Sequence, residues 1–257
     1  MPHSDLFGTK EVLLFDLDNT LMYMDENEFI ADYFTRLSRY FKDLRVSIPE
    51  FAQIMISATK AMTKVDYSKT TIEKFLEEFT KQTRLSNTEV TKRFTEFYQK
   101  DFRDCSLTVK SIPFAETVIK RALDYGYKVV IATNPLFSEI ASDIRLQWAG
   151  LYRFKKQFSM VTTGNLIHHT KPHVEYYKEI LAKLRVENPR ECLMIGDDPV
   201  NDGAASLVGI EYFQLQTEEE SGNPQPHFLD EQATRLFGKR DIRISYEGTL
   251  NDLYRAL

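Results

Sequence analysis

The chain has 257 residues, of which 42% are hydrophobic and 28% charged, a globular balance that excludes a disordered or low-complexity protein. Its 33 Lys and Arg against 38 Asp and Glu leave a formal charge of −5, which argues against a nucleic-acid partner bound through bulk positive charge. The two cysteines lack the spacing of a metal site, and no apolar run approaches the roughly 18 residues of a membrane span. The N-terminus is polar. These features predict a cytoplasmic protein with no membrane association.

A short apolar run at residues 11–15 leads into a polar cluster at residues 16–20, which predicts a buried strand that ends in a loop. Residues 23–107 then carry helical patterns and no convincing strand. Apolar side chains between Phe29 and Leu44 recur at steps of three and four, which predicts a helix whose aromatic face packs in a helical core. Three Ser or Thr residues, each followed three positions later by Glu, predict further helices near residues 49–63, 71–83 and 87–102.

The pattern changes after residue 108, where short apolar runs alternate with helical stretches, as is typical of a parallel α/β sheet. The predicted strands cover residues 128–132, 158–162, 191–195, 210–215 and, at the sheet edge, 241–245. The predicted helices cover residues 114–125, 135–146, 173–184, 202–208 and 249–257. Residues 217–226 are charged and then contain Gly and Pro, which predicts an exposed loop.

The predicted fold class is therefore α/β, a Rossmann-like core with a three-layer parallel sheet that an all-helical insertion of four helices interrupts after the first strand. Residues 1–22 and 108–257 form the predicted core domain, and residues 23–107 form the predicted helical domain. Ligands of open parallel sheets bind at the carboxyl ends of the strands, so the polar residues just after each strand are the candidate site.

Polar residues follow three of these strands. The first strand is followed by Asp16, Asp18 and Thr20, and the strand that ends at residue 132 is followed by Thr133 and Asn134. The strand that ends at residue 195 is followed by Asp197, Asp198, Asn201 and Asp202. Lys171 lies just before a predicted helix. At one rim these carboxylates repel one another unless a cation lies among them. Oxygen ligands without His or Cys favour Mg²⁺, and a lysine with two hydroxyls nearby suits a phosphoryl group.

A carboxylate in such a site can attack phosphorus, and a second carboxylate can protonate the leaving oxygen and later activate water. Residues two apart in an extended segment point the same way, so Asp16 and Asp18 are expected to face one substrate. Tyr23, Met24 and Asp25 leave this segment directly, which makes them candidates for contacting the leaving group.

These motifs resemble those of the haloacid dehalogenase-like (HAD) hydrolase superfamily, in its phosphatase branch. The matching pieces occur in the family's order: Asp-Leu-Asp-Asn-Thr at residues 16–20, Thr133, Lys171 followed by proline, and Gly-Asp-Asp-Pro-Val-Asn-Asp at residues 196–202. The helical insertion resembles the family's small helical cap. The resemblance implies a Mg²⁺-dependent phosphomonoester hydrolase that acts on a small phosphorylated metabolite through an aspartyl-phosphate intermediate.

By the same resemblance, Asp16 is the catalytic nucleophile and Asp18 the general acid and base. Thr133 and Lys171 are implied to hold and neutralise the phosphoryl oxygens, and Asn134 stands beside them as a further phosphate-binding candidate. Substrate choice is expected to depend on the helical cap. Sugar phosphates, nucleotides and phosphoglycolate-like acids are all compatible with these motifs, and the oligomeric state stays open.

The metal site implied by the resemblance consists of Asp16, Asp18 through its backbone carbonyl, Asp197, and Asp202 acting through water or through the motif lysine. Asp198 departs from the family pattern, which often has a small or hydroxylated residue at this position. The extra acid leaves open which of Asp197, Asp198 and Asp202 touches the metal directly.

Three alternatives remain at this point. A haloacid dehalogenase of the same superfamily is disfavoured by Asp18, because the dehalogenase branch resembles this chain without the second acid and without a metal. A phosphomutase needs a sugar-phosphate pocket in the cap, and residues 23–107 show no clear sign of one. A catalytically idle regulatory binding module would usually lack Asp16 or Asp18, and both are present.

Overall fold

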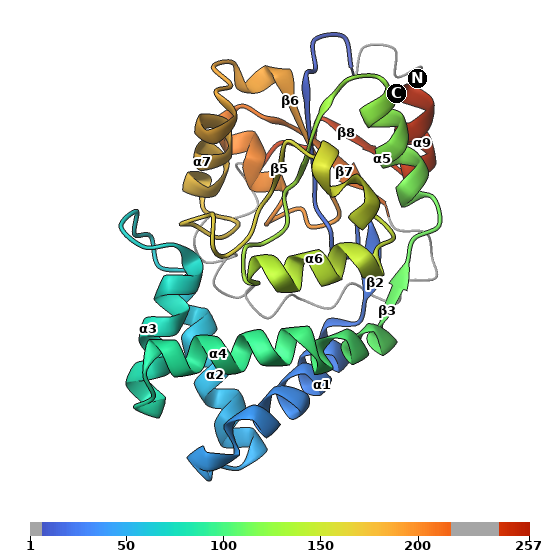
Figure 1. Cartoon of the computed structure of the whole chain (residues 1–257). Helices are drawn as coiled ribbons and strands as arrows, with labels where there is room; N and C mark the ends of the chain where they lie inside the picture. The colour runs from blue at the N-terminus through green and yellow to red at the C-terminus, as the bar shows by residue number, and fades with distance from the viewer. Residues whose placement is uncertain (1–6, 217–241) are drawn as a thin grey trace.

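The computed structural model describes residues 7–216 and 242–257, and a six-stranded parallel sheet forms its centre in the order β5-β4-β1-β6-β7-β8. The strands are β1 (Val12–Phe15), β4 (Lys128–Ile131), β5 (Met160–Val161), β6 (Cys192–Gly196), β7 (Glu211–Leu215) and β8 (Tyr246–Gly248). The predicted α/β fold class with its Rossmann-like sheet is confirmed, and β1 lies in the middle of the sheet (Figure 1).

Helices cover both faces of this sheet, which explains the unbroken apolar run of β1. The surrounding helices are α5 (Ala115–Asp124), α6 (Glu139–Trp148), α7 (Val174–Leu184) and α9 (Leu250–Ala256), with 3₁₀ helices η3 (Tyr152–Gln157), η4 (Pro189–Glu191) and η5 (Gly203–Val208). Alternate β1 side chains enter different apolar clusters. Leu13 and Phe15 pack with residues of α5 and α9, whereas Val12 and Leu14 pack with residues of α7 and η5.

The all-helical insertion lies between β1 and β4 in the sequence and packs around its own aromatic core. Its elements are α1 (Glu26–Ser38), η1 (Arg39–Leu44), α2 (Ile48–Met62), α3 (Thr71–Thr83), α4 (Asn87–Gln99) and η2 (Asp101–Thr108). Ser47 and Thr70 form reciprocal capping boxes with the Glu three positions on, as their spacing predicts. Within residues 7–216 and 242–257, no helix combines the length and apolarity that a membrane crossing requires.

Several element bounds differ from the sequence prediction. A two-stranded antiparallel ribbon of β2 (Met22–Met24) and β3 (Val109–Ser111) flanks the insertion where no strand is predicted, because three residues are too few to show a period. The predicted edge strand at residues 241–245 is wrong for its described residues, since β8 begins at Tyr246. The predicted loop at residues 217–226 lies outside the described residues.

Two further bounds move for local reasons. The predicted helix over residues 135–146 begins instead at Glu139, because the Ser138 side chain caps its first turn by accepting from the Ala141 backbone N–H. The long helix expected from Phe29 to Leu44 is α1 followed by the separate 3₁₀ helix η1.

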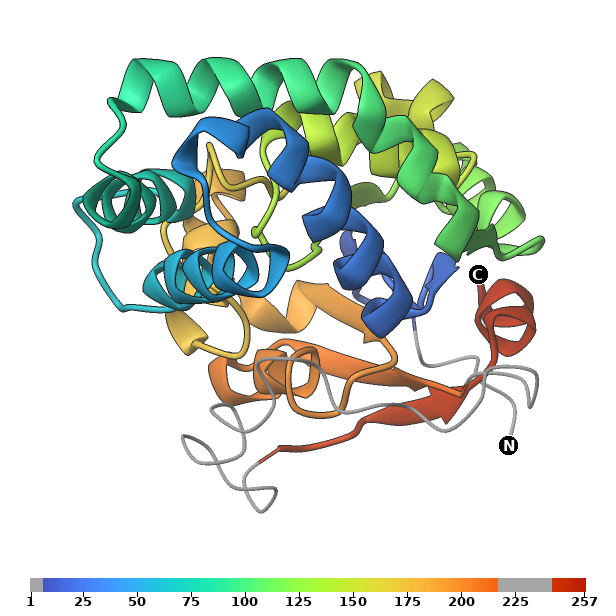
Figure 2. The ribbon, with the colours of Figure 1, turned by 90° about the horizontal axis from the view of Figure 1, so that it is seen from below.

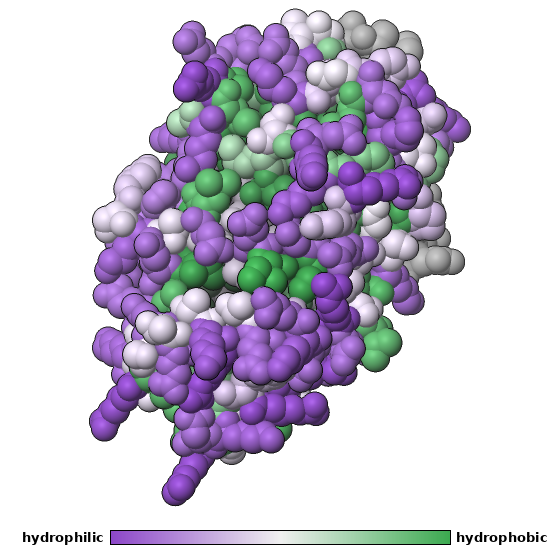
Figure 3. Space-filling view, in the orientation of Figure 1, coloured by the Kyte–Doolittle hydropathy of each residue, from purple (hydrophilic) through white to green (hydrophobic). Residues whose placement is uncertain are grey.

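The insertion contacts the core through the β2–β3 ribbon, at the start of α3, and where α4 and η2 pack against α6 (Figure 2). The β2–β3 ribbon carries its two ends, and the start of α3 docks on core loops. The backbone N–H of Thr71 donates to the Ile167 carbonyl (2.9 Å), and that of Ile72 donates to the Gly164 carbonyl (3.0 Å). On the face drawn in Figure 3, hydrophilic residues dominate and hydrophobic ones gather near α6, at the boundary with the insertion.

Replacing Thr71 with Val should loosen this second attachment. The buried Thr71 hydroxyl donates to the Pro135 carbonyl at 2.6 Å, and the isosteric valine leaves that carbonyl without this donor. We expect a loss of about 1–2 kcal/mol in the free energy of unfolding, measured by urea titration. Thr88→Val on exposed α4 surface is the matched control and should change little. Equal stability of the two variants would show that the hydroxyl contributes nothing to docking.

Candidate active site

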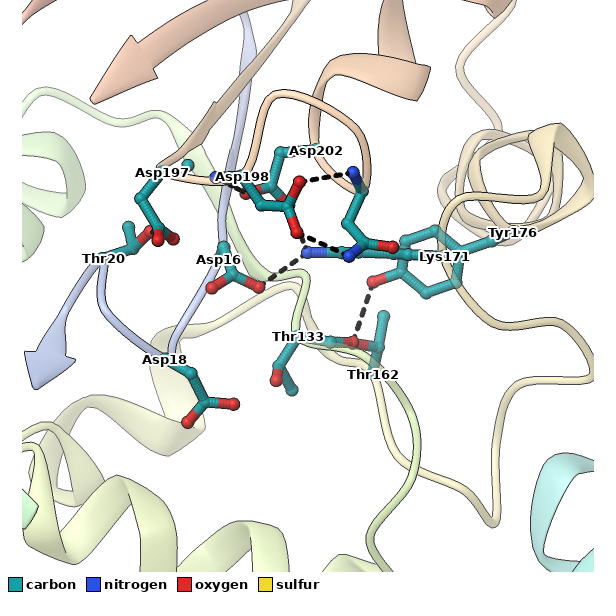
Figure 4. Close-up of polar contacts among 12 residues, drawn as sticks. Asp16, Asp18, Thr20, Thr133, Thr162, Lys171, Tyr176, Asp197, Asp198 and Asp202 are labelled. Atoms are coloured by element: carbon teal, nitrogen blue, oxygen red, sulfur yellow. Dashed lines mark hydrogen bonds and ion pairs between the residues drawn. The ribbon is translucent and has the colours of Figure 1, made fainter. Parts of the chain in front are cut away.

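The site segments meet at one edge of the sheet. Asp16 directly follows β1, and Asp197 directly follows the neighbouring strand β6. Lys171 reaches the same edge from the loop before α7, and Asp202 reaches it from the turn after β6. Figure 4 shows the four side chains gathered around one point. Residues far apart in the sequence therefore converge because neighbouring parallel strands end side by side.

Three carboxylates form a cluster that fits a divalent metal ion. One oxygen from each of Asp16, Asp197 and Asp202 lies within 4.8 Å of the other two. Oxygens bound about 2.1 Å from an octahedral Mg²⁺ stand roughly 3–4 Å apart, so a small movement would bring all three onto one ion. The oxygen-only donor set suits such a hard cation. The Asp18 carboxylate lies outside this cluster, so the implied metal role of Asp18 depends on its backbone carbonyl.

Lys171 links two members of the cluster. Its Nζ lies 2.6 Å from Asp16 Oδ1 and 2.6 Å from Asp202 Oδ1, and its side chain is buried (Figure 4). Burial alone lowers the pKa of Lys171, but the two carboxylates outweigh it and hold that pKa well above its usual range. The lysine is therefore a fixed positive charge. One positive charge beside three acids leaves the cluster short of cations, which favours metal binding.

Asp198 has a different task from its acidic neighbours. Its carboxylate accepts hydrogen bonds from the backbone N–H groups of Val200 (2.7 Å) and Asn201 (2.9 Å) and from the Asn201 side chain (2.5 Å). These bonds fold the turn that carries Asp202. A Cβ at Gly196 would overlap the Asp202 carboxylate, so glycine is needed for this close approach. The geometry favours the other two acids of the motif, and not Asp198, as metal ligands.

A buried arginine that sequence analysis misses holds the second motif acid. Arg145 of α6 donates a hydrogen bond to Asp18 Oδ2, and the same nitrogen lies 3.4 Å from Thr133 Oγ1. Its guanidinium also stands 4.7 Å from the ring centroid of Phe137. Asp18 Oδ1 has no hydrogen-bond partner among the described residues. Helical spacing alone does not distinguish Arg145 from a surface arginine, so only the packing of α6 reveals it.

The loop after β4 is held by two hydroxyl groups that sequence analysis also misses. Thr162 Oγ1 donates to the Thr133 carbonyl at 2.6 Å, and the Tyr176 hydroxyl donates to it at 3.0 Å. Burial raises the pKa of Tyr176, so the phenol stays protonated and can donate. Thr133 itself is buried beneath the site, whereas Asn134 lines the cavity above it.

A cavity of about 460 Å³ extends from the acidic cluster toward the helical insertion. Asp16, Asp18 and Lys171 all line it, so both acids of the first motif face one space, in line with their spacing. Of the three leaving-group candidates on the following segment, only Met24 lines the cavity. Asp25 instead caps α1 by accepting from the Glu28 backbone N–H at 3.0 Å.

Comparison with known proteins gives a family. Residues 10–209 match the sequence model of haloacid dehalogenase-like hydrolases, and this span includes every motif of the site. No curated protein sequence matches the chain significantly.

Solved structures of similar fold include hydrolases of more than one kind. A HAD phosphatase from Thermococcus onnurineus is 19% identical with a TM-score of 0.54, covering 95% of each chain. A predicted phosphoglycolate phosphatase from Haemophilus somnus 129PT is 16% identical with a TM-score of 0.53, covering 95% of this chain and 96% of its own. A dehalogenase with an intermediate complex is 13% identical with a TM-score of 0.50, covering 97% of each.

At these identities the solved structures show a shared fold only. The family assignment rests on the sequence match, together with the site. The match extends over residues 10–209, and the motif residues of that span meet at one rim of the sheet. The chain belongs to the haloacid dehalogenase-like hydrolase family.

Proposed function

We propose that the chain is a Mg²⁺-dependent phosphomonoester hydrolase that works through an aspartyl-phosphate on Asp16. The convergence of Asp16, Asp197 and Asp202 around Lys171 carries this proposal, because it joins a nucleophile, a cation site and a fixed positive charge. Asp18 lines the same cavity and supplies the second acid that phosphoryl transfer to and from Asp16 needs.

In the first half-reaction, a carboxylate oxygen of Asp16 attacks phosphorus while the bond from phosphorus to the ester oxygen breaks. Asp18 gives its proton to the departing oxygen, so the product leaves as a neutral alcohol. Lys171 holds Asp16 through its 2.6 Å contact and offsets negative charge on the phosphoryl oxygens. A bound Mg²⁺, held by Asp16, Asp197 and Asp202, would supply further charge neutralisation.

In the second half-reaction, Asp18 takes a proton from water, and the water oxygen attacks the phosphorus of the aspartyl-phosphate. The bond between phosphorus and the Asp16 oxygen breaks, which releases inorganic phosphate and restores the carboxylate. Asp18 thus acts as acid and then as base. Its unpartnered Oδ1 is available for both transfers, while Arg145 holds Oδ2.

We also propose that residues 1–22 and 108–257 act as the catalytic core and residues 23–107 as a cap. The cavity walls include residues of α1, α2, α3 and α4, so the insertion covers the reacting groups. A cover of this kind excludes bulk water during transfer to Asp16.

Phosphate release from p-nitrophenyl phosphate, with Mg²⁺ and with EDTA, tests the proposed function. We expect turnover with Mg²⁺ and at least about a hundredfold loss with EDTA, since the metal offsets charge in the transition state. Halide release from a small 2-haloacid in the presence of EDTA, without phosphatase activity, would instead support the dehalogenase alternative and overturn the proposal.

Arg145→Met should weaken catalysis through Asp18. Without the guanidinium, the Asp18 carboxylate loses its partner, and proton donation to the leaving group becomes less well aligned. In single-turnover experiments, which report the first half-reaction, we expect the rate of alcohol release from an alkyl phosphate to fall about tenfold to a hundredfold, and that of p-nitrophenol release from p-nitrophenyl phosphate, whose leaving group needs no proton, to fall much less. Arg145→Lys should recover part of the loss. An equal fall for both esters would indicate a structural role alone.

A further inference from the structure

The cavity beyond the acidic cluster is walled by aromatic side chains. Those that line it include Phe29, Tyr33, Phe75, Phe94, Tyr98 and Phe137. The first five come from the helical insertion, and Phe137 comes from the core loop after β4. The stripe that begins at Phe29 is expected from the sequence to be helical core. Phe29, Tyr33 and Phe41 are buried in that core as expected, and Phe29 and Tyr33 also line the cavity, whereas Phe41 packs against Phe51 and Phe79 inside the insertion.

These rings support one another, so the wall is formed before a ligand binds. The Phe137 ring lies edge-on to Phe29 (6.1 Å between centroids) and to Tyr33 (6.0 Å). Phe94 packs edge-on against Phe75 at 5.5 Å. Such aromatic contacts are favourable beyond the free energy of burying apolar area, and those of Phe137 join the core to the insertion. A pocket of about 460 Å³ lined in this way has room for a ring-bearing group next to the phosphate site.

Charge in the cavity is strongly one-sided. Among the described residues that line it, Lys171 is the basic one, and its Nζ donates hydrogen bonds to two carboxylates of the cluster. Beyond the cluster, Asp18, Asp198 and Glu26 also line the cavity, as does Glu139, which pairs with Lys155 outside the lining (3.3 Å). A second anionic group on a substrate, such as a carboxylate or another phosphate, would meet negative charge with no cation assigned to it. Burying such a charge without a partner is costly.

One polar feature stands within the aromatic wall. The hydroxyls of Tyr33 and Tyr98 lie 3.0 Å apart, and one donates to the other, which leaves one hydroxyl proton of the pair for a further acceptor. Burial raises the pKa of Tyr98 to about 12, so both groups remain neutral donors near pH 7. The wall can therefore take a neutral group with one acceptor atom, such as an ether or carbonyl oxygen.

We infer that this cavity selects phosphate monoesters of apolar, ring-bearing or branched alcohols that carry no second anionic group. The inference rests on the proposed phosphatase function and names the substrate class of the same site. It disfavours phosphoglycolate-like acids, sugar bisphosphates and nucleotides with more than one phosphate, because each would place a second anionic group against the acidic lining.

Three primary alkyl esters with similar leaving groups test this class: 2-phenylethyl phosphate, glucose 6-phosphate and phosphoglycolate. With Mg²⁺ present, we expect kcat/KM for the phenylethyl ester to exceed that of the other two at least about tenfold, from burial of one ring. Equal or faster hydrolysis of glucose 6-phosphate or phosphoglycolate would overturn the inference while leaving the phosphatase function intact. No hydrolysis of these esters or of p-nitrophenyl phosphate would overturn the proposed function and the inference with it.

A cation placed in the cavity should shift the preference. Thr95 of α4 lines the cavity and is half-buried, so Thr95→Arg introduces a positive charge there. We expect the ratio of kcat/KM for phosphoglycolate to that for 2-phenylethyl phosphate to rise at least about tenfold. Thr88→Arg makes the same change on the exposed face of α4, outside the cavity lining, and should leave the ratio unchanged. An unchanged ratio in Thr95→Arg would contradict the charge argument.

Discussion

Asp16→Asn is expected to lower Mg²⁺-dependent phosphate release at least about a thousandfold, because an amide cannot form the phosphoryl bond that covalent catalysis requires. The fold should survive, since asparagine has nearly the same shape and its carbonyl oxygen can still accept a hydrogen bond from Lys171. Lys171 also retains its hydrogen bond to Asp202. Removing one negative charge also reduces repulsion within the acidic cluster. Steady-state assays with p-nitrophenyl phosphate give the activity, and thermal unfolding gives the stability.

The matched control for this variant is Asp124→Asn, which makes the same chemical change on exposed surface near the end of α5. Its turnover and melting temperature should remain close to those of the parent chain. Undiminished turnover in Asp16→Asn would reject Asp16 as the nucleophile. Loss of activity accompanied by unfolding would instead place the effect of the substitution on the structure.

Lys171→Met is expected to reduce both stability and activity. It removes the buried cation between Asp16 and Asp202 and leaves their carboxylates facing each other. Breaking a buried ion pair from one side typically costs about 3–5 kcal/mol. A divalent ion should recover part of this loss, because it supplies the missing positive charge, so the Mg²⁺-dependent rise in melting temperature should be larger in the variant than in the parent.

Lys74→Met provides the comparison, because Lys74 is also a buried lysine but donates to the backbone carbonyls of Lys64 (2.7 Å) and His168 (2.5 Å) rather than to carboxylates. Its loss should lower the melting temperature without increasing the effect of Mg²⁺. Calorimetry with and without Mg²⁺ separates the two cases. A Lys171→Met variant that is as stable as the parent without metal would show that the lysine does not balance the cluster.

Much of the core could be predicted because its strands are buried on both faces. The apolar run of β1 is continuous for that reason, and the polar residues after it mark the carboxyl edge of the sheet. Asp16, Lys171, Asp197 and Asp202 lie together at that edge because parallel neighbours end side by side, so chain order and strand position were sufficient to gather them. Capping spacing located the starts of α2 and α3 in the same way.

The missed features depend on contacts that no local pattern encodes. β2 and β3 are three residues long and gain their pairing from each other across the whole insertion. Arg145 occupies an ordinary helical position, and its role follows from the approach of α6 to Asp18. The apolar period from Phe29 onward identifies one face of a helix, but it does not say whether that face meets another helix or a cavity.

Trapping the phosphoryl group tests the central claim most directly, and Asp18→Asn is the variant for it. With p-nitrophenyl phosphate, whose leaving group needs no acid, phosphoryl transfer to Asp16 should proceed while hydrolysis slows for want of a base. We predict a burst of about one equivalent of p-nitrophenol in rapid-quench experiments, with the added phosphoryl mass located on Asp16 by peptide mapping. Continued turnover with no burst, or with the phosphoryl group on another residue, would contradict the account.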